Sequence, residues 1–334
     1  MSEKINIIIP AIKIDEELLT CLKEINKIKY SNFFVTIVLD YDEYSYLPKF
    51  KYKIHKLIVG KINMSKKRNL AAKKFKSKYI AFIDSDAYPN KNWLKLAVKY
   101  LKQKKGDVVG GPSLPFSNQN YSEKICYLSK RSLFVTGYLN FRKYKAKSRH
   151  CDWLESCNLV MEKKFFLKYK GMDENRYTGE DKEFFERARR KNPNIKVFYS
   201  PDLYIHHRER RFFGFLLQRS CFGMDFLNLI KYNVGLRGFQ PLLPLSVFLF
   251  IFMIVFSNII FFTKIIILAA SLSLINFIIL LETKRYIKSS KDLILTILTI
   301  NLANLAFALG SLLGLLGLQK VLANKVYAYS RWNN

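Results

Sequence analysis

The stretch Tyr79-Ile-Ala-Phe-Ile-Asp84-Ser-Asp86 decides the fold of the N-terminal part of this chain. Its continuous apolar run is typical of a strand buried on both faces of a parallel sheet. The two carboxylates that follow are two positions apart, so both can reach one hard cation beyond the strand. Such a cation could bridge the oxygens of a diphosphate and stabilise it as a leaving group. Many ordinary turns also contain an Asp-x-Asp, so the motif alone is a weak signal. The buried strand before it strengthens the functional interpretation.

Working outward, similar apolar runs alternate with segments of helical periodicity. The predicted strands are Ile5–Ile9, Phe34–Leu39, Ile54–Val59, Tyr79–Ile83, Asp107–Gly111, Cys157–Met161 and Lys196–Tyr199, and the predicted helices are Asp15–Lys29, Ser65–Phe75 with Ser65 as its cap, and Lys91–Gln103. This alternation indicates βαβ units and a mostly parallel α/β sheet. Ligands bind such sheets beyond the carboxyl ends of the strands, where Asp40, Asp84 and Asp86 would gather. Three carboxylates there favour a divalent metal or a ligand rich in hydroxyl and NH groups.

A second segment runs Gly171-Met-Asp173-Glu174-Asn-Arg-Tyr-Thr-Gly179-Glu180-Asp181 and precedes an amphipathic helix, Lys182–Arg190. Glu180 and Asp181 stand at the predicted helix start, where backbone NH groups and the helix dipole stabilise ionised carboxylates. A general base needs that ionised form. Plain helix capping explains the same pattern, and both readings stay open.

A third segment is Leu203-Tyr-Ile-His206-His207-Arg208-Glu-Arg210-Arg211. A histidine that follows a strand can complete a metal site, and arginines can hold phosphate oxygens. A basic surface cluster beside a membrane is the alternative.

The C-terminal part contains three apolar stretches, Leu242–Phe262, Ile265–Leu281 and Leu293–Leu318. A helix of about 20 apolar residues crosses the hydrocarbon core of a bilayer. The first and third stretches are long enough, and the second is at the short end, separated from the first only by Thr263 and Lys264. Buried helices of a soluble domain are the disfavoured alternative, because such long helices usually carry a polar stripe.

The formal net charge of +30 is concentrated before residue 241, since residues 241–334 carry only 8 Lys/Arg and 2 Asp/Glu. Three alternatives explain this charge: nucleic-acid binding, attraction to anionic lipids, or a general abundance of lysine in the sequence. The apolar stretches favour the last two explanations, and no nucleic-acid recognition motif is present. Basic residues between the second and third stretches, and before the first, predict that these loops and the N-terminal part face the cytoplasm of a multi-pass cell-membrane protein. Five cysteines without a CxxC pair argue against a disulfide framework.

Taken together, these segments resemble family 2 glycosyltransferases of the GT-A fold. The resemblance covers roughly residues 4–210 and rests on the order of several motifs. These are Ile5–Pro10, Ile37–Asp40, Lys67-Arg68-Asn69, Tyr79–Asp86, Cys157-Asn158-Leu-Val-Met161, Gly171-Met-Asp173-Glu174 and Gly179-Glu180-Asp181.

The resemblance implies roles for the residues that match. The nucleotide sugar would be held by Pro10, Asp40, Arg68, Asp84 and Asp86. Mn²⁺ or Mg²⁺ would be bound by Asp86 directly, with Asp84, and by a late histidine. For that histidine the resemblance leaves His206 and His207 open, with a preference for His206. Asp181 looks like the catalytic base of an inverting transferase, with Glu180 beside it.

Several positions depart from the family pattern. Ala11 and Ile12 replace the Asn-Glu that usually follows the first strand, Tyr41 replaces a second Asp, and Cys157 replaces a Gly. The Gln-x-x-Arg-Trp motif of processive enzymes is absent, which favours transfer of a single sugar. The Tyr41 position makes recognition of the nucleotide base an open question.

The sequence therefore predicts three regions. Residues 1–210 form a GT-A catalytic domain, 211–240 an interfacial helix and linker, and 241–334 about three transmembrane helices. An ordinary core helix is the alternative for Arg211–Tyr232. The predicted function is a membrane-anchored inverting glycosyltransferase that uses a UDP- or GDP-sugar, with a lipid-linked or envelope-glycan acceptor and no nucleic acid. A catalytically inactive scaffold of a glycan-assembly complex is the main alternative, and a transporter component is a weaker one.

Overall fold

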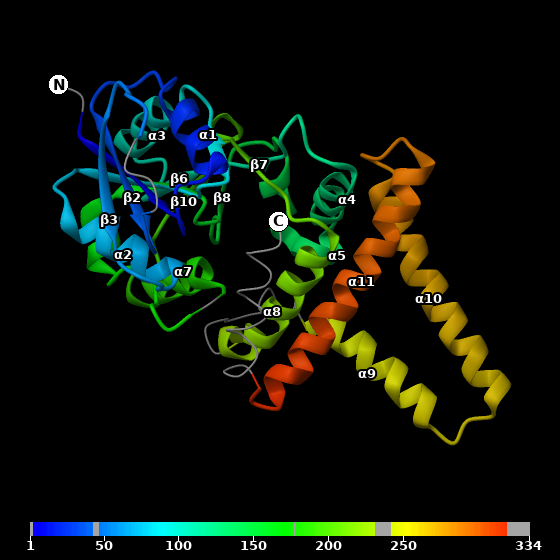
Figure 1. The fold of residues 1–334 in the computed structure, drawn as a ribbon. Helices are drawn as coiled ribbons and strands as arrows, with labels where there is room; N and C mark the ends of the chain where they lie inside the picture. The colour runs from blue at the N-terminus through cyan, green and yellow to red at the C-terminus, as the bar shows by residue number, and fades with distance from the viewer. Residues whose placement is uncertain (1–2, 43–46, 177, 231–241, 319–334) are drawn as a thin grey trace. The chain divides into compact units, whose positions relative to one another are not determined.

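The structure is a computed structural model that describes residues 3–42, 47–176, 178–230 and 242–318. It divides into two compact units (Figure 1). The first comprises Met1–Ser117 and Phe141–Arg208, and the second comprises Asn118–Asn140 and Glu209–Asn334. The predicted boundaries at 210 and 240 remain predictions, and residues 231–240 of the predicted linker lie outside the described residues.

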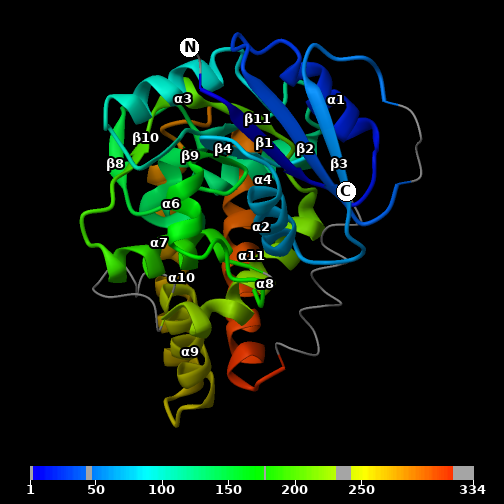
Figure 2. The ribbon, with the colours of Figure 1, turned by 90° about the vertical axis from the view of Figure 1, so that its left-hand side faces the viewer.

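The first unit is built on an eight-stranded mixed sheet in the order β3-β2-β1-β4-β9-β6-β10-β8. Figure 2 shows β3, β2, β1 and β4 as one fan of neighbouring arrows. The strands are β1 (Ile5–Pro10), β2 (Phe33–Leu39), β3 (Lys53–Ile58), β4 (Tyr79–Ile83), β6 (Val108–Gly110), β8 (Arg149–Cys151), β9 (Asn158–Glu162) and β10 (Val197–Tyr199). β1, β2, β3 and β4 are parallel, and β9 runs antiparallel to both β4 and β6. The predicted α/β class with a mixed, mostly parallel sheet is confirmed.

The strands β1, β2 and β4 are buried along their whole length. This burial explains why their sequences are continuously apolar: a strand covered on both faces has no side that contacts solvent. The polar exceptions satisfy each other, because the Thr36 hydroxyl donates to Asn6 Oδ1 at 2.7 Å inside the sheet. Helices α1 (Glu16–Ile25), α2 (Met64–Lys74), α3 (Trp93–Lys102), α6 (Lys163–Lys168) and α7 (Glu180–Lys191) complete the unit, together with the short 3-10 helix η2 (Pro201–Leu203).

The N-terminus of α2 differs from the prediction. Asn63 caps this helix, and its side chain accepts a hydrogen bond from Lys66 N at 2.8 Å. Ser65 lies inside the first turn instead. Asn and Ser are comparable capping residues. The sequence alone therefore could not decide between Asn63 and Ser65, two positions apart, as the N-cap.

A second sheet was not predicted. It contains three short strands in the order β5 (Ala87–Pro89), β11 (Ile205–His207), β7 (Ser113–Leu114). β11 is antiparallel to β5, with His207 opposite Ala87, and Arg208 N donates to Asp86 O at 3.0 Å. Strands of two or three residues carry no periodicity that a sequence reading can detect. This pairing brings residue 207 next to the end of the Asp84–Asp86 motif.

The second unit consists of helices. They are α4 (Tyr121–Lys130), α5 (Leu133–Thr136), α8 (Phe212–Ile230), α9 (Leu242–Phe256), α10 (Phe261–Thr283) and α11 (Ser290–Leu315), with the 3-10 helix η1 (Gly137–Lys143) leading back to the first unit. Among the described residues, two helices, α10 and α11, are long and apolar enough to span a membrane. C-terminal apolar helices are thus confirmed, but the helix boundaries differ from those predicted.

The turn between the first two apolar helices falls at residues 257–260, not at Thr263–Lys264. As a result α9 has 15 described residues and α10 has 23, the reverse of the predicted lengths. Ser257 and Asn258 are turn-forming residues, and the Ser257 hydroxyl donates back to Ile254 O at 2.8 Å. Lys264 remains inside the first turn of α10, where its Nζ donates to Val255 O at 3.0 Å.

Helix α8 packs directly against α11. A Cβ at Gly223 of α8 would collide with Phe307 O, and a Cβ at Gly310 or Gly314 of α11 would collide with the backbone of α8. Close approach through small residues is the packing mode of helices in a membrane. Phe215 of α8 belongs to the core of this unit, and Phe212 and Leu216 pack against that core. The Phe226 side chain lies outside the described residues, as do Lys231 and Tyr232.

Polar contacts attach the insertion Asn118–Asn140 to the ends of α10 and α11. Glu282 accepts from the Ser132 hydroxyl and from Leu133 N, both at 2.6 Å. Lys124 Nζ pairs with Asp292 at 2.6 Å. The turn between α10 and α11 is therefore fixed to the segment Asn118–Asn140 of the same unit.

Candidate active site

The carboxyl ends of β1, β2 and β4 form one edge of the large sheet, as the pairing register requires. Pro10 ends β1, Asp40 follows β2, and Asp84 and Asp86 follow β4. Asp84 and Asp86 are both partly exposed, with side-chain exposures of 32% and 26%. This edge of the sheet is therefore the part of the unit where carboxylates are open to a ligand.

Arg68 links two of the predicted motifs. Its side chain is 3% exposed, and its guanidinium pairs with Asp84 Oδ1 at 2.7 Å and with Glu180 Oε1 at 3.3 Å. The Asp-x-Asp after β4 and the carboxylates at the start of α7 are more than 90 residues apart in sequence. One buried cation holds both, because a buried guanidinium needs paired carboxylates. Arg68 thus lies at the centre of the site.

His207 is the histidine that faces these carboxylates. Its Nε2 lies 3.7 Å from Asp84 Oδ2 and 3.5 Å from Asp86 Oδ1. Its Nδ1 lies 2.7 Å from Arg208 O. A carbonyl oxygen only accepts, so Nδ1 carries a proton, and Nε2 is directed to the carboxylate side. Metal-binding histidines commonly have this arrangement.

The preferred candidate from sequence, His206, is placed elsewhere. Its Nδ1 lies 2.8 Å from Pro115 O, and its ring packs beside Tyr88 at 5.1 Å. Consecutive residues of a strand point to opposite faces, so only one of the two histidines can face the Asp-x-Asp. The short pairing of β11 with β5 places His207, and not His206, on the side of the Asp-x-Asp.

Cys157 completes this cluster. One potential ligand atom each of Asp84, Cys157 and His207 lies within 4.8 Å of the other two. Burial raises the pKa of the Cys157 thiol well above its usual value, so the group is neutral in the metal-free protein. Carboxylate, imidazole and thiol are all metal ligands, and the residues present therefore fit a divalent cation at this position.

Asp40 is held by a buried lysine. Lys67 Nζ lies 2.7 Å from Asp40 Oδ1 and also donates to Ala11 O, and the lysine side chain is 0% exposed. The ion pair joins the ends of β1 and β2. Sequence reasoning assigned no role to Lys67, although it precedes Arg68 in a motif that was recognised. The one hint in the sequence was the position of Lys67 on the predicted helix, on the side that faces the strand ends.

Asp181 is half-buried at the start of α7. Its carboxylate accepts hydrogen bonds from Lys182 N at 2.8 Å and Ser156 N at 3.2 Å. Burial, together with the neighbouring Glu180, raises the pKa of Asp181 to about 7. A carboxyl group with a pKa near neutrality is suited to accept and release a proton at physiological pH.

The turn before α7 is fixed by Asn69, whose role the sequence analysis missed. Its side chain accepts from Met172 N at 2.9 Å and donates to Met172 O at 2.8 Å and to Glu174 Oε1 at 3.0 Å. Gly171 has a φ of +66°, and a Cβ there would collide with the Asn69 side chain. Thus α2 positions the motif that leads to Asp181. Only the recurrence of Lys67-Arg68-Asn69 in the family hinted at this.

Of the arginines expected to hold phosphate, Arg208 lies beside the site. Its Nε pairs with Glu17 of α1 at 2.5 Å, and its guanidinium lies 5.0 Å from the Phe116 ring. This pairing orients the segment that carries His207. Arg210 and Arg211 belong to the second unit.

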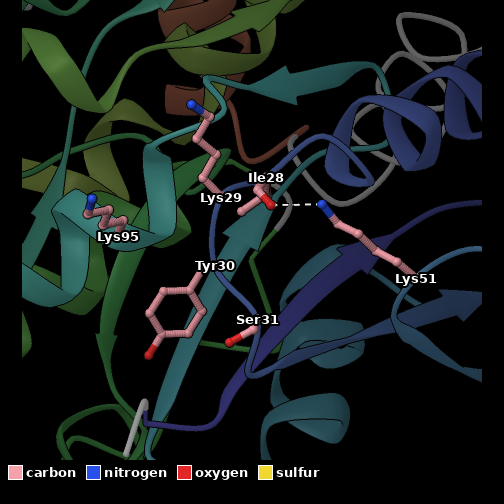
Figure 3. A pocket seen from close by; sticks show the side chains of 6 residues that line it. All are labelled: Ile28, Lys29, Tyr30, Ser31, Lys51 and Lys95. Atoms are coloured by element: carbon pink, nitrogen blue, oxygen red, sulfur yellow. Dashed lines mark hydrogen bonds between the residues drawn. The ribbon is translucent and has the colours of Figure 1, made fainter.

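A pocket of about 560 Å³ lies elsewhere on the first unit. It is lined by Ile28, Lys29, Tyr30, Ser31, Lys51 and Lys95, and Figure 3 shows Lys51 reaching the Ile28 carbonyl, a 2.9 Å hydrogen bond. Ile28–Ser31 precede β2 and Lys51 precedes β3, so the pocket is at the amino ends of these strands, with Lys95 of α3 beside them. The candidate site is at their carboxyl ends, and this pocket is no part of it.

A mixed α/β sheet with an Asp-x-Asp at its ligand edge is the architecture of the GT-A fold. The family model described as Glycosyl transferase family 2 matches residues 6–168. This match covers just under half of the chain, and that part of the chain is similar to family 2 glycosyltransferases. No curated protein matched the sequence.

A solved structure with a TM-score above 0.5 shares this fold. The mannosyltransferase PcManGT from Pyrobaculum calidifontis, in complex with GDP-Man and Mn²⁺, matches with a TM-score of 0.56 and 12% identity over 93% of this chain and 88% of its own. TarS from S. aureus matches with a TM-score of 0.44 and 17% identity over 76% of this chain, which spans only 44% of the TarS chain. Residues 1–349 of TarS in complex with UDP-GlcNAc match with a TM-score of 0.46 and 15% identity over 94% and 92% of the two chains.

Proposed function

We propose that the protein is a membrane-anchored inverting glycosyltransferase that moves one sugar from a UDP- or GDP-type donor to a hydroxyl or phosphate acceptor. One observation carries this proposal. The Asp84–Asp86–His207 cluster is joined through Arg68 to the helix start that bears Glu180 and Asp181. A donor-binding end and a base-bearing end are thereby parts of one site.

The donor diphosphate would lie at the carboxyl edge of the sheet, near Asp84 and Asp86, with the nucleoside toward Pro10 and Asp40. Asp84, Asp86 and His207 would hold Mn²⁺ or Mg²⁺. When bound, the cation offsets the negative charge that grows on the leaving diphosphate. Arg68 orients Asp84 through their 2.7 Å ion pair.

Asp181 would act as the general base. It accepts the proton of the acceptor hydroxyl while the acceptor oxygen forms a bond to the anomeric carbon. The bond from that carbon to the diphosphate oxygen breaks on the opposite face, and the diphosphate leaves with the electron pair. A single displacement inverts the configuration. Glu180, held by Arg68, supports the helix start beside it.

The membrane part of the proposal rests on the second unit. Helices α10 and α11 expose large apolar side chains and have spanning length. The α10–α11 turn contains Lys284, Arg285 and Lys288, which favours a cytoplasmic location. The contacts of Glu282 with Ser132 and Leu133 support placing the catalytic part on that same side. An acceptor linked to a lipid, such as an envelope-glycan precursor, fits this location, and anionic lipids would attract the basic turn.

The experiment that tests the function is donor binding by the full-length protein in detergent. A panel of UDP-, GDP- and dTDP-sugars is titrated with and without Mn²⁺, beside Asp84→Ala/Asp86→Ala and the control Asp202→Ala, which removes a carboxylate outside the site. We expect one donor class to bind, to require Mn²⁺ and to lose binding only in the double variant. Lack of binding by every donor would favour an inactive, transferase-like scaffold instead.

The acceptor is tested separately. Transfer to a polyprenyl phosphate in the same micelle is compared with transfer to a water-soluble sugar acceptor. We expect the lipid-linked acceptor to be used in preference. Equal use of both would remove the argument that connects the membrane helices to the acceptor.

A further inference from the structure

Position 157 places a thiol where the metal is expected, in the residue immediately before β9. In the antiparallel pairing of β9 with β4, Asn158 lies opposite Ile83. Continuing that register by one residue places Cys157 opposite Asp84. The location of the thiol is therefore fixed by two strands of the central sheet.

The side chain faces the candidate ligands. Its sulfur is grouped with a carboxylate oxygen of Asp84 and a ring nitrogen of His207, all within 4.8 Å of one another. Ligands that share one cation lie roughly 3–4 Å apart, given metal–ligand bonds of about 2.0–2.3 Å. Small side-chain rotations would close the remaining distance. The residue is 7% exposed, so the sulfur reaches the site from the protein interior.

We propose that Cys157 supplies a thiolate ligand to the metal bound by Asp84 and His207. This inference rests on the proposed function, because it assumes that a divalent cation occupies the site. A site built from carboxylates alone suits hard cations such as Mg²⁺. Adding a thiolate and an imidazole shifts the preference to softer cations such as Co²⁺ and Zn²⁺. On binding, the thiol proton leaves to solvent and the sulfur lone pair forms the bond to the metal.

The ordinary alternative is that Cys157 is a small buried side chain. Its sulfur lies 3.5 Å from the Ser113 hydroxyl, a contact that a packing role would also produce. A second cysteine provides a matched control. Cys21 is also buried next to the motif, but its sulfur is directed to the backbone carbonyl of Asp84 at 3.8 Å. Both cysteines therefore lie near Asp84. Of the two, Cys157 is the one whose sulfur faces a carboxylate and an imidazole.

The test is a Co²⁺ titration of the full-length protein in detergent, read by absorption. Bonding to thiolate produces a near-ultraviolet charge-transfer band, and the weaker visible bands report bound Co²⁺ whatever its ligands. We expect the charge-transfer band in the native protein and in Cys21→Ala. We expect its loss in Cys157→Ala and Cys157→Ser, with the visible bands retained.

Competition between Zn²⁺ and Mg²⁺ for the site gives a second measurement. We expect the preference for Zn²⁺ to fall by about tenfold or more in Cys157→Ala. Co²⁺ binding without a charge-transfer band, or a band that survives in Cys157→Ala, would overturn this inference and leave the proposed transferase intact. Absence of any Co²⁺ binding would overturn the inference together with the metal role of Asp84 and His207.

Discussion

The two units of this chain bury their residues in opposite ways. In the first, apolar strands are covered and charged groups gather at one sheet edge, where Arg68 joins Asp84 to Glu180. In the second, the large apolar side chains of α10 are on the outside, with Phe261 and Phe262 71% and 75% exposed. Helices that expose apolar side chains over spanning length are stable in lipid. The contrast supports the proposal that the chain is adapted to two solvents, with the proposed chemistry in the first unit.

The largest effect should come from the Asp181 carboxylate of the first unit. Asp181→Asn keeps the shape of the side chain but removes its ability to accept a proton. We expect turnover to fall by about 10²–10⁴-fold, the usual contribution of a general base, while donor affinity changes little. The measurement is steady-state turnover with donor binding on the same preparation.

Asp202→Asn is the matched control, because this carboxylate accepts only a weak bond from Tyr100 at 3.5 Å. Near-normal turnover of Asp181→Asn would refute the assignment of the base. Equal losses in both variants would indicate a general effect on folding.

The close packing of the second unit is tested by Gly310→Leu. The new side chain would have to displace the backbone of α8 at Ser220. We expect α8 and α11 to separate, at a cost of about 3 kcal/mol or more, above the usual range for overpacking because backbone must move. Leu309→Ile, on the exposed neighbouring position, is the control. Thermal unfolding in detergent provides the comparison, and equal melting of the two variants would contradict this packing.

In the first unit the corresponding test is Gly171→Ala. The residue has a positive φ, and the new Cβ would collide with an Asn69 side chain that is held at both ends. We expect a loss of about 2–4 kcal/mol, combining backbone strain with the broken clamp. Gly60→Ala separates the two causes, since Gly60 has a φ of +72° but no atom within 4 Å of its Cβ. That variant should lose only about 1–2 kcal/mol.

The smallest effect concerns pH. The pKa of Asp181 is raised to about 7, so the carboxylate is protonated below that value and cannot act as a base. Turnover should therefore fall as pH decreases through about 7, by roughly tenfold per pH unit below it. Above it, the rate should reach a plateau. A pH–rate profile with a constant rate down to pH 5 would show that Asp181 does not limit the reaction as a base.

Local sequence was enough to predict the parts of the fold that depend on neighbouring residues. The apolar runs of β1, β2 and β4 predicted buried parallel strands because such strands have no solvent face. The carboxylates at their ends followed directly, since parallel strands end at one edge. The turn between α9 and α10 was placed wrongly, because Thr263–Lys264 interrupts hydropathy more visibly than the Ser257–Asn258 turn.

The histidine could not be chosen from sequence. His206 and His207 are adjacent and chemically identical, and their directions depend on how β11 pairs with β5. The same holds for Cys157, which looked like a mere departure from a family glycine until β9 placed it opposite Asp84. Lys67 and Asn69 also acquired roles only through contacts with residues far along the chain.

By itself, the sequence determined that this chain has a basic α/β part with a carboxylate-lined sheet edge and an apolar helical part. Hydrophobic periodicity and charge distribution are local properties, and these two conclusions need nothing else. The tertiary structure decided which side chains meet: Arg68 with Asp84 and Glu180, and His207 with Asp84 and Asp86. Most of those meetings depend on strand register or on contacts across more than 90 residues, and Arg68 meets Asp84 across 16, so no local pattern encodes them.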